Sequence, residues 1–146
     1  MPLSKDEVLL VVLSLANGEP LTPVQVQKSL FLADDKVRTA FRAGSRYEFQ
    51  PYDYGPFDRE VYLDAQSMSR TGLVEISSDM RGGWNTYAAT NAGLNRARAL
   101  RERLSVPELE ILKRIVGFVR SLSFTELVSA IYRGYPHMKE RSVFRD

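Results

Sequence analysis

Four segments of this chain carry the same helix-start pattern, and they favour a fold built mainly of helices. In each, Ser or Thr is followed three residues later by Glu or Gln, and the four segments begin at Ser4, Thr22, Ser105 and Ser123. In such a capping box the first side chain accepts a hydrogen bond from the first turn, and the Glu or Gln side chain reaches back to the cap residue. Apolar residues follow every start, so we expect four helices there.

Two further helices and a small sheet are predicted between these segments. One helix is predicted over residues 57–71, where apolar residues recur in steps of three and four. Another begins at Thr90. Residues 73–77 and 84–90 are rich in β-branched and aromatic residues around a Gly-Gly turn, which predicts a β-hairpin. Residues 47–54 alternate loosely and are the candidate for an edge strand of the same sheet.

Together these elements predict a single α+β domain, mainly α-helical, over residues 1–146. The order of helices and hairpin in residues 1–93 is that of a winged-helix-like core, and residues 94–146 add C-terminal helices and a tail. A chain of 146 residues can bury a core without disulfides, and this one has no Cys. The apolar run near its N-terminus is shorter than the roughly 20 residues of a membrane span and lacks the features of a signal peptide. We therefore expect a cytoplasmic protein with no membrane attachment.

Few residue types in the sequence suit catalysis or metal binding. Because there is no Cys and only one His, His137, a metal site would need carboxylates. The closest set is Asp53, Asp58, Glu60 and Asp64, and acids on a helix face are commonly just solvated. The motifs of α/β-hydrolases, phosphate loops and zinc metalloproteases do not occur. We therefore predict no catalytic residue, no metal and no cofactor.

Binding to nucleic acid is one of two functions that the sequence leaves open. Residues 1–72 carry 8 Lys and Arg against 10 Asp and Glu, whereas residues 73–146 carry 12 against 8. In a winged helix the segment 57–71 would enter the DNA groove, yet its three acids would repel phosphates. The residues available for such contacts are Arg59, Arg70, Arg81 and Trp84. A winged-helix DNA-binding transcriptional regulator is therefore the alternative hypothesis.

Binding to another protein is favoured by a resemblance. Residues 26–34 read VQKSLFLAD, residues 52–57 read YDYGPF, Leu73-Val74 follows a Gly, and residues 87–93 read YAATNAG. These are similar to the L-Q-K-L-L-Y-F-x-D helix, the aromatic-x-Y-G-P segment, the G-L-I strand and the Y-x-L-T-x-x-G turn of the Panacea (SocA-like) antitoxin domain. The similar segments keep their order over residues 22–93, about half of the chain.

The resemblance implies an antitoxin-type module that binds and neutralises a co-encoded toxin protein, in some relatives by presenting the toxin to a protease. It implies no cofactor and no active site. Two positions depart from the family pattern, since Ser29 stands where an apolar residue is usual and Ala89 replaces a common Leu. Whether the chain forms a homodimer stays open.

The candidate partner-binding residues combine a polar pair with a group of aromatic side chains. Gln27 and Lys28 interrupt an otherwise apolar helix start, and we expect them to hydrogen-bond to the Tyr-Asp-Tyr-Gly loop. Aromatic side chains dominate binding energy at many protein interfaces. Packing in the core is the alternative role for each aromatic residue. The predicted set is Gln27, Lys28, Tyr52, Asp53, Tyr54, Phe57, Tyr62 and Trp84.

Overall fold

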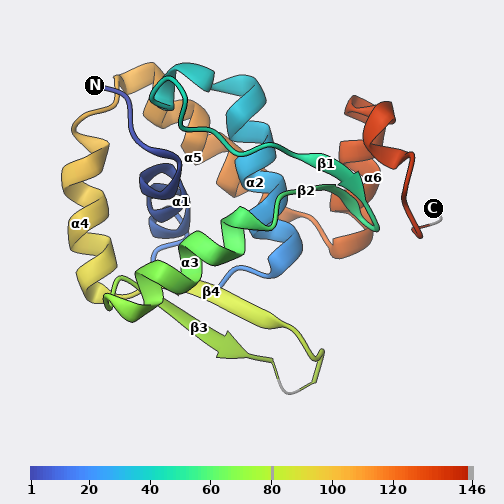
Figure 1. Cartoon of the computed structure of the whole chain (residues 1–146), viewed down its shortest axis with the longest axis horizontal. Helices are drawn as coiled ribbons and strands as arrows, with labels where there is room; N and C mark the ends of the chain where they lie inside the picture. The colour runs from blue at the N-terminus through green and yellow to red at the C-terminus, as the bar shows by residue number, and fades with distance from the viewer. Residues whose placement is uncertain (80, 145–146) are drawn as a thin grey trace.

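The computed structural model describes residues 1–79 and 81–144, and the described part is an α+β fold that is mainly helical, as predicted (Figure 1). Within it, β1 pairs with β2 and β3 with β4, each pair antiparallel. The winged-helix assignment stays a prediction. The helices are α1 (Lys5–Ser14), α2 (Pro23–Lys36), α3 (Glu60–Arg70), α4 (Asn91–Arg101), α5 (Val106–Ser121) and α6 (Phe124–Gly134), and the strands are β1 (Gln50–Tyr52), β2 (Gly55–Phe57), β3 (Val74–Ser78) and β4 (Asn85–Ala89).

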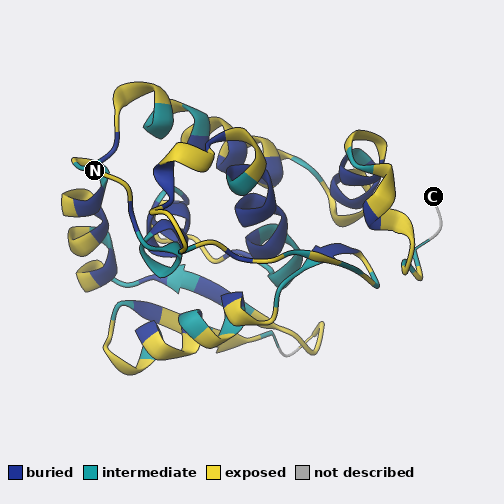
Figure 2. Cartoon of the chain, turned by 45° about the horizontal axis from the view of Figure 1, so that its top comes forward, coloured by how far each residue is buried: buried dark blue, intermediate teal, exposed yellow. Residues whose placement is uncertain are grey.

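Helix α1 is the centre of the core. All residues from Val8 to Ser14 are buried, because α2, α3, α4 and α5 surround this helix. Figure 2 shows buried residues concentrated on the central helices, while the outer helices expose one face. Asn17 and Gly18 follow with φ of 55° and 86°, the left-handed conformation expected for a helix stop.

The four predicted capping boxes are all present. The carboxylates of Glu7, Glu108 and Glu126 accept hydrogen bonds of 2.8–2.9 Å from the amide of the cap residue three positions before them. The Gln25 side chain does the same for Thr22 at 2.9 Å. Each helix therefore begins where its local sequence specifies.

The predicted helix over residues 57–71 begins later than expected. Phe57 belongs to β2, and α3 begins at Glu60. Asp58 makes the difference, because its carboxylate accepts a hydrogen bond of 2.9 Å from the Glu60 amide and one of 2.7 Å from the Glu48 amide. The Asp58 side chain thus satisfies a free amide of the first helical turn from two residues before the helix, while Arg59, directly before α3, makes no side-chain cap.

The predicted edge strand within residues 47–54 forms, but in a different sheet. Residues Gln50–Tyr52 pair with Gly55–Phe57 across the turn at Asp53-Tyr54, and not with the β3–β4 hairpin. Gly55 has φ of 105°, a conformation that favours Gly, and this lets the chain reverse directly into β2. The β3–β4 hairpin itself matches its prediction.

The C-terminal segment returns to the β1–β2 hairpin. A 3-10 turn (Pro136–Lys139) follows α6 and packs on β1 and β2 (Figure 1). The Val143 amide then donates a hydrogen bond of 2.9 Å to the Asp53 carbonyl. Among the described residues, none of the helices combines the length and apolar character needed to traverse a bilayer.

Candidate functional site

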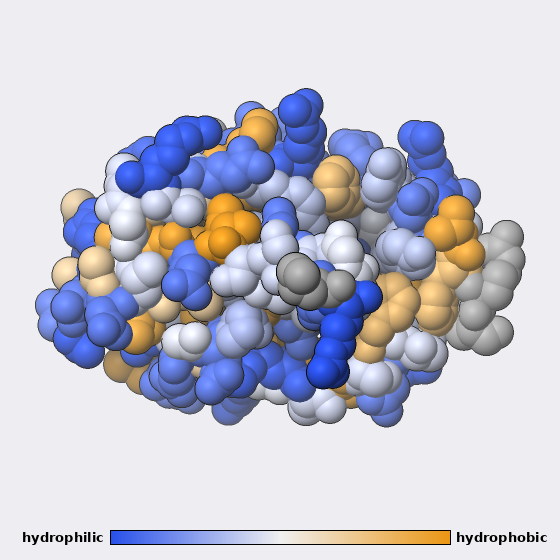
Figure 3. Space-filling view, turned by 90° about the horizontal axis from the view of Figure 1, so that it is seen from below, coloured by the Kyte–Doolittle hydropathy of each residue, from blue (hydrophilic) through white to orange (hydrophobic). Residues whose placement is uncertain are grey.

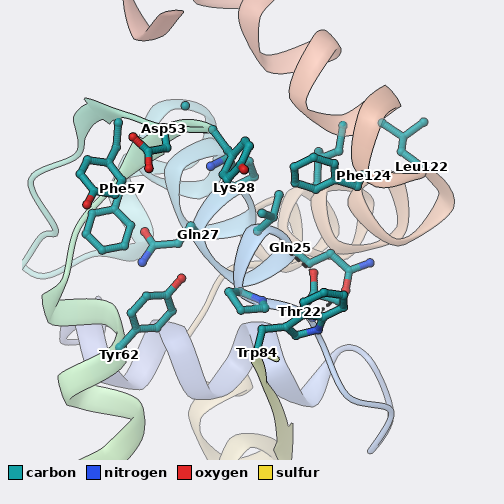
Figure 4. A pocket seen from close by; sticks show the side chains of 16 residues that line it. Thr22, Gln25, Gln27, Lys28, Asp53, Phe57, Tyr62, Trp84, Leu122 and Phe124 are labelled. Atoms are coloured by element: carbon teal, nitrogen blue, oxygen red, sulfur yellow. Dashed lines mark hydrogen bonds between the residues drawn. The ribbon is translucent and has the colours of Figure 1, made fainter. Parts of the chain in front are cut away.

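An open cavity of about 670 Å³ lies between α2, the β1–β2 hairpin, the start of α6 and the end of the β3–β4 hairpin (Figure 4). Its walls are mainly apolar and aromatic. All of the residues predicted from the sequence to bind a partner line it, although they come from four separate segments of the chain. These residues are Gln27, Lys28, Tyr52, Asp53, Tyr54, Phe57, Tyr62 and Trp84.

One side of the cavity is a chain of aromatic contacts that links β1 to β4. Tyr52 stacks on Phe57 with ring centroids 4.8 Å apart, and Phe57 meets the edge of Tyr62 at 5.7 Å. Tyr62 in turn stacks on Tyr87 at 5.6 Å. Phe57 and Tyr62 are half-buried in this chain, so packing is part of their role, whereas Tyr52 is 48% exposed at its outer end.

The opposite side is a second aromatic group, of which only Tyr54 was predicted from the sequence. Tyr54 contacts the edge of Phe124 at 5.2 Å, and Phe124 contacts Phe144 at 6.1 Å. Figure 4 shows Phe124 and Leu122 facing the cavity from the side of α6. Phe124 lies off the buried stripe of its helix and is 46% exposed, and an aromatic residue off such a stripe was the signal that sequence reasoning missed.

Trp84 reaches the cavity from the turn of the β3–β4 hairpin and is 44% exposed. The carboxylate of Asp79 shapes this turn by accepting hydrogen bonds from the amides of Arg81, at 2.8 Å, and Gly82, at 3.0 Å. A Cβ atom on Gly82 would lie only 2.0 Å from the indole ring. Because Gly82 has no side chain, Trp84 can lie against the turn.

Lys28 lies at the floor of the cavity and is only 3% exposed. Its Nζ atom donates a hydrogen bond of 3.2 Å to the Pro56 carbonyl. Burial lowers the pKa of this lysine to about 7. The β2 backbone lies directly over the side chain, since a Cβ on Gly55 would be 3.4 Å from the Lys28 Cε atom.

Gln27 fastens α2 to the segment that follows β2. Its amide nitrogen donates to the Asp58 carbonyl at 2.9 Å, and its amide oxygen accepts from the Asp58 amide at 3.0 Å. The hydrogen bonds of Gln27 and Lys28 thus reach Asp58 and Pro56 and not the Tyr-Asp-Tyr-Gly loop, which corrects the expected partner. The reason is that β2 runs alongside α2, whereas the loop turns beyond it. Figure 4 shows the Gln27 amide and the Tyr62 phenol pointing toward each other.

The acids considered as metal ligands have separate structural roles. Asp58 accepts a hydrogen bond from the first amide of α3, Glu60 pairs with Lys5, and Asp64 accepts a hydrogen bond of 2.7 Å from the Tyr47 hydroxyl. Asp53 lines the cavity. In the described part of the chain, no three potential metal ligands come together.

The residues of the DNA-binding alternative lie at separate points of the fold. Arg59 precedes α3 and Arg70 is in its last turn, about 16 Å away at 1.5 Å rise per residue. Arg81 is in the β3–β4 turn, and all three arginines are exposed. Trp84 shares the cavity with the partner-binding residues.

Comparison of the chain with models of known protein families gives no match, and comparison with curated protein sequences gives none either.

Proposed function

We propose that this protein is a non-enzymatic binding module that recognises a segment of another protein in the cavity between α2, β1–β2 and α6. The observation that supports this proposal is the gathering of half-exposed aromatic residues around one open cavity. Tyr52, Tyr54, Trp84 and Phe124 expose 48%, 42%, 44% and 46% of their surface there. Large aromatic side chains that stay accessible beside a concave surface are typical anchors for a protein partner.

A binding role also agrees with the arrangement of the polar side chains in the cavity. Gln27 is tied to the Asp58 backbone, and the Lys28 ammonium donates to the Pro56 carbonyl. These hydrogen bonds fix both side chains before a ligand binds, so the protein itself loses less conformational freedom on binding. The resemblance to Panacea antitoxin domains makes a co-encoded toxin protein the first partner to test, and a protease the second.

The test is co-purification with the product of the neighbouring gene, followed by calorimetric titration. Tyr54→Ala combined with Phe124→Ala removes the pair that contacts at 5.2 Å, and we expect its affinity to fall by about 30-fold or more. Because both side chains are almost half exposed, the double variant should keep a cooperative unfolding transition.

Phe118→Ala is the matched control. Phe118 is an aromatic residue of α5 that is 48% exposed and lies outside the cavity, so its removal should leave affinity unchanged. Equal loss of affinity in both variants, or unchanged affinity in the double variant, would contradict the proposed site. Retention of the wild-type protein on duplex DNA in preference to the protein partner would favour the regulator hypothesis instead.

A further inference from the structure

Of the charged side chains that line the cavity, the Lys28 ammonium is the most deeply buried. It is 3% exposed, and within the described part of the chain no carboxylate oxygen lies within 4.0 Å of it. A lysine ammonium has three donor hydrogens, and the structure gives it one acceptor, the Pro56 carbonyl. A buried cation without a counterion is costly, so such a group indicates a role other than stability.

The side chains around Lys28 would strengthen its hydrogen bond to a bound anion. Aromatic side chains flank the floor on both sides, with the Tyr52–Phe57 stack on one and the Tyr54–Phe124 pair on the other. A ligand in this position would exclude water, and hydrogen bonds between charged groups are stronger where water is excluded.

The charge of the site fits a single negative charge. Lys28 supplies one positive charge, and the other polar side chain of the floor, Gln27, has its amide occupied by the Asp58 backbone. Asp53 also lines the cavity, and its repulsion grows with the charge of the ligand, so it disfavours a polyanion more than a single carboxylate. A phosphate group carries up to two negative charges and asks for several donors, whereas a carboxylate carries one.

We infer that the protein segment bound in this cavity places the carboxylate of an Asp or Glu side chain on the Lys28 ammonium, with apolar residues on either side of it against the aromatic walls. This inference rests on the proposed function, because it names the chemistry of the segment that the binding module recognises. Figure 3 shows hydrophobic residues at the end of the molecule that carries the C-terminal segment and a second hydrophobic group toward the opposite end, on a face that is otherwise largely hydrophilic.

The titration of Lys28 makes the expected affinity for an acidic segment depend on pH. Its pKa is lowered to about 7 by burial, so the free protein loses the ammonium as the pH rises above neutrality. The titratable side chains on the segments packed around it include Tyr52, Asp53 and Tyr54 of the β1–β2 hairpin, Asp58 after it, Tyr62 of α3 and Tyr132 of α6. Burial raises the pKa of Tyr62 to about 12. Affinity for an acidic segment should therefore fall about tenfold per pH unit above neutrality, since only the protonated lysine binds the carboxylate.

The experiment is a selection of short random peptides displayed on phage against the whole protein. Selected sequences are then synthesised without Trp and titrated while the fluorescence of Trp84 is recorded. Trp84 is the single Trp of the chain and lines the cavity, so its emission reports occupancy. Each peptide is compared with the copy in which Asp is replaced by Asn or Glu by Gln.

We expect the selected peptides to share one Asp or Glu between apolar residues. Neutralising that acid should weaken binding by about 30-fold or more, and Lys28→Met should weaken it equally while abolishing the difference between the two peptides. Lys36→Met is the control, because Lys36 lies on the same helix, is exposed, and is not part of the cavity lining. It should leave both affinities unchanged.

The possible failures separate the two proposals. Peptides that bind wild type and Lys28→Met equally, with no acidic residue in common, would overturn the carboxylate inference and leave the peptide-binding function standing. Failure to select any peptide that perturbs Trp84 would overturn both. Quenching of Trp84 by free phenylacetate, without any peptide binding, would identify a small-molecule site and overturn both as well.

Discussion

Lys5 and Lys28 contact the same stretch of chain, residues 47–64, and the structure treats them in opposite ways. Lys5 pairs with the Glu60 carboxylate, and its Nζ atom lies 5.2 Å from the centre of the Tyr47 ring. The hydrogen bond to Glu60 raises the pKa of Lys5 despite partial burial. Lys28 is more deeply buried, has a backbone carbonyl as its acceptor, and has a lowered pKa.

The difference between the two lysines shows that the cavity floor is a place where the fold is less stable than it could be. The Lys5 cluster contains its own counterions, with the Tyr47 hydroxyl completing the shell of Asp64 at 2.7 Å. The floor of the cavity contains no counterion for Lys28 among the described residues, although the neighbouring β1–β2 segment carries an acidic residue, Asp53. Functional sites commonly keep such uncompensated groups, and their replacement stabilises a protein while removing its activity.

The largest effect is expected for Lys28→Met. Met is close to Lys in length and removes the cost of a buried ammonium, which at about 1.4 kcal/mol per pKa unit is on the order of 5 kcal/mol. The Pro56 carbonyl loses its donor, and this costs about 1–2 kcal/mol. The net gain in the free energy of unfolding should be about 3 kcal/mol at pH 7, measured by urea denaturation. A destabilised variant would show that Lys28 is compensated after all.

The pH dependence of that gain provides a second test. The pKa of Lys28 is lowered to about 7 in the folded state, against 10.5 when unfolded, so between these values the unfolded chain binds the extra proton. Wild-type stability therefore rises with pH over this window, and the advantage of Lys28→Met is full below pH 7 and shrinks as the pH approaches 10.5. Because the two chains differ at one residue, all other titrations cancel in the comparison. A gain that stays constant with pH would contradict the lowered pKa.

Gly55→Ala is expected to destabilise by about 2 kcal/mol, measured by thermal denaturation, since an Ala at φ of 105° is strained. Its Cβ would have ordinary contacts of 3.4 Å with Lys28 and Tyr132, so the cost comes from the backbone. Gly117→Ala is the control. Gly117 lies within α5 with open space around its Cβ position, and this change should stabilise by up to about 1 kcal/mol. Equal changes in stability for Gly55→Ala and Gly117→Ala would show that the β1–β2 hairpin does not depend on the positive φ of Gly55.

The sequence predicts those parts of the fold that depend on neighbouring residues, and it does not predict those that depend on contacts between distant segments. The four capped helices were predictable because the two groups of a capping box are three residues apart. The start of α3 depends on Asp58, whose backbone is held by Gln27 from 31 residues away. Its position therefore follows from tertiary contacts, which local pattern does not specify.

The candidate site divides in the same way. Gln27 and Lys28 were identifiable as polar residues in an apolar helix, and Tyr52 and Tyr54 as aromatic residues beside a turn. The contact between Tyr54 and Phe124 joins segments far apart in the chain and arises only when α6 packs beside β2. The burial of Lys28 likewise depends on β2 lying over it.

Tyr47→Phe tests the compensated side of the comparison. The change removes the hydroxyl that donates to Asp64 at 2.7 Å, and it should cost about 1.5 kcal/mol in chemical denaturation at pH 7. Burial already raises the pKa of Asp64, and loss of the hydrogen bond should raise it further. Tyr54→Phe is the control, because Tyr54 is 42% exposed and its hydroxyl makes no hydrogen bond within the described residues. Equal losses would mean that the Tyr47 hydroxyl contributes nothing specific.

The smallest effect is expected for Lys5→Met, with a loss of about 0.5 kcal/mol at low salt, because the partner carboxylate of Glu60 is 57% exposed and solvent weakens the attraction. Salt should separate the two lysines. At about 1 M salt the exposed pair is screened, so wild type and Lys5→Met should converge in urea denaturation. The advantage of Lys28→Met should persist, because it comes from burial and not from an attraction that ions can screen. If Lys5→Met instead stabilised the protein at every salt concentration, both lysines would be uncompensated, and the lack of a counterion would no longer distinguish Lys28 as the proposed ligand-binding charge.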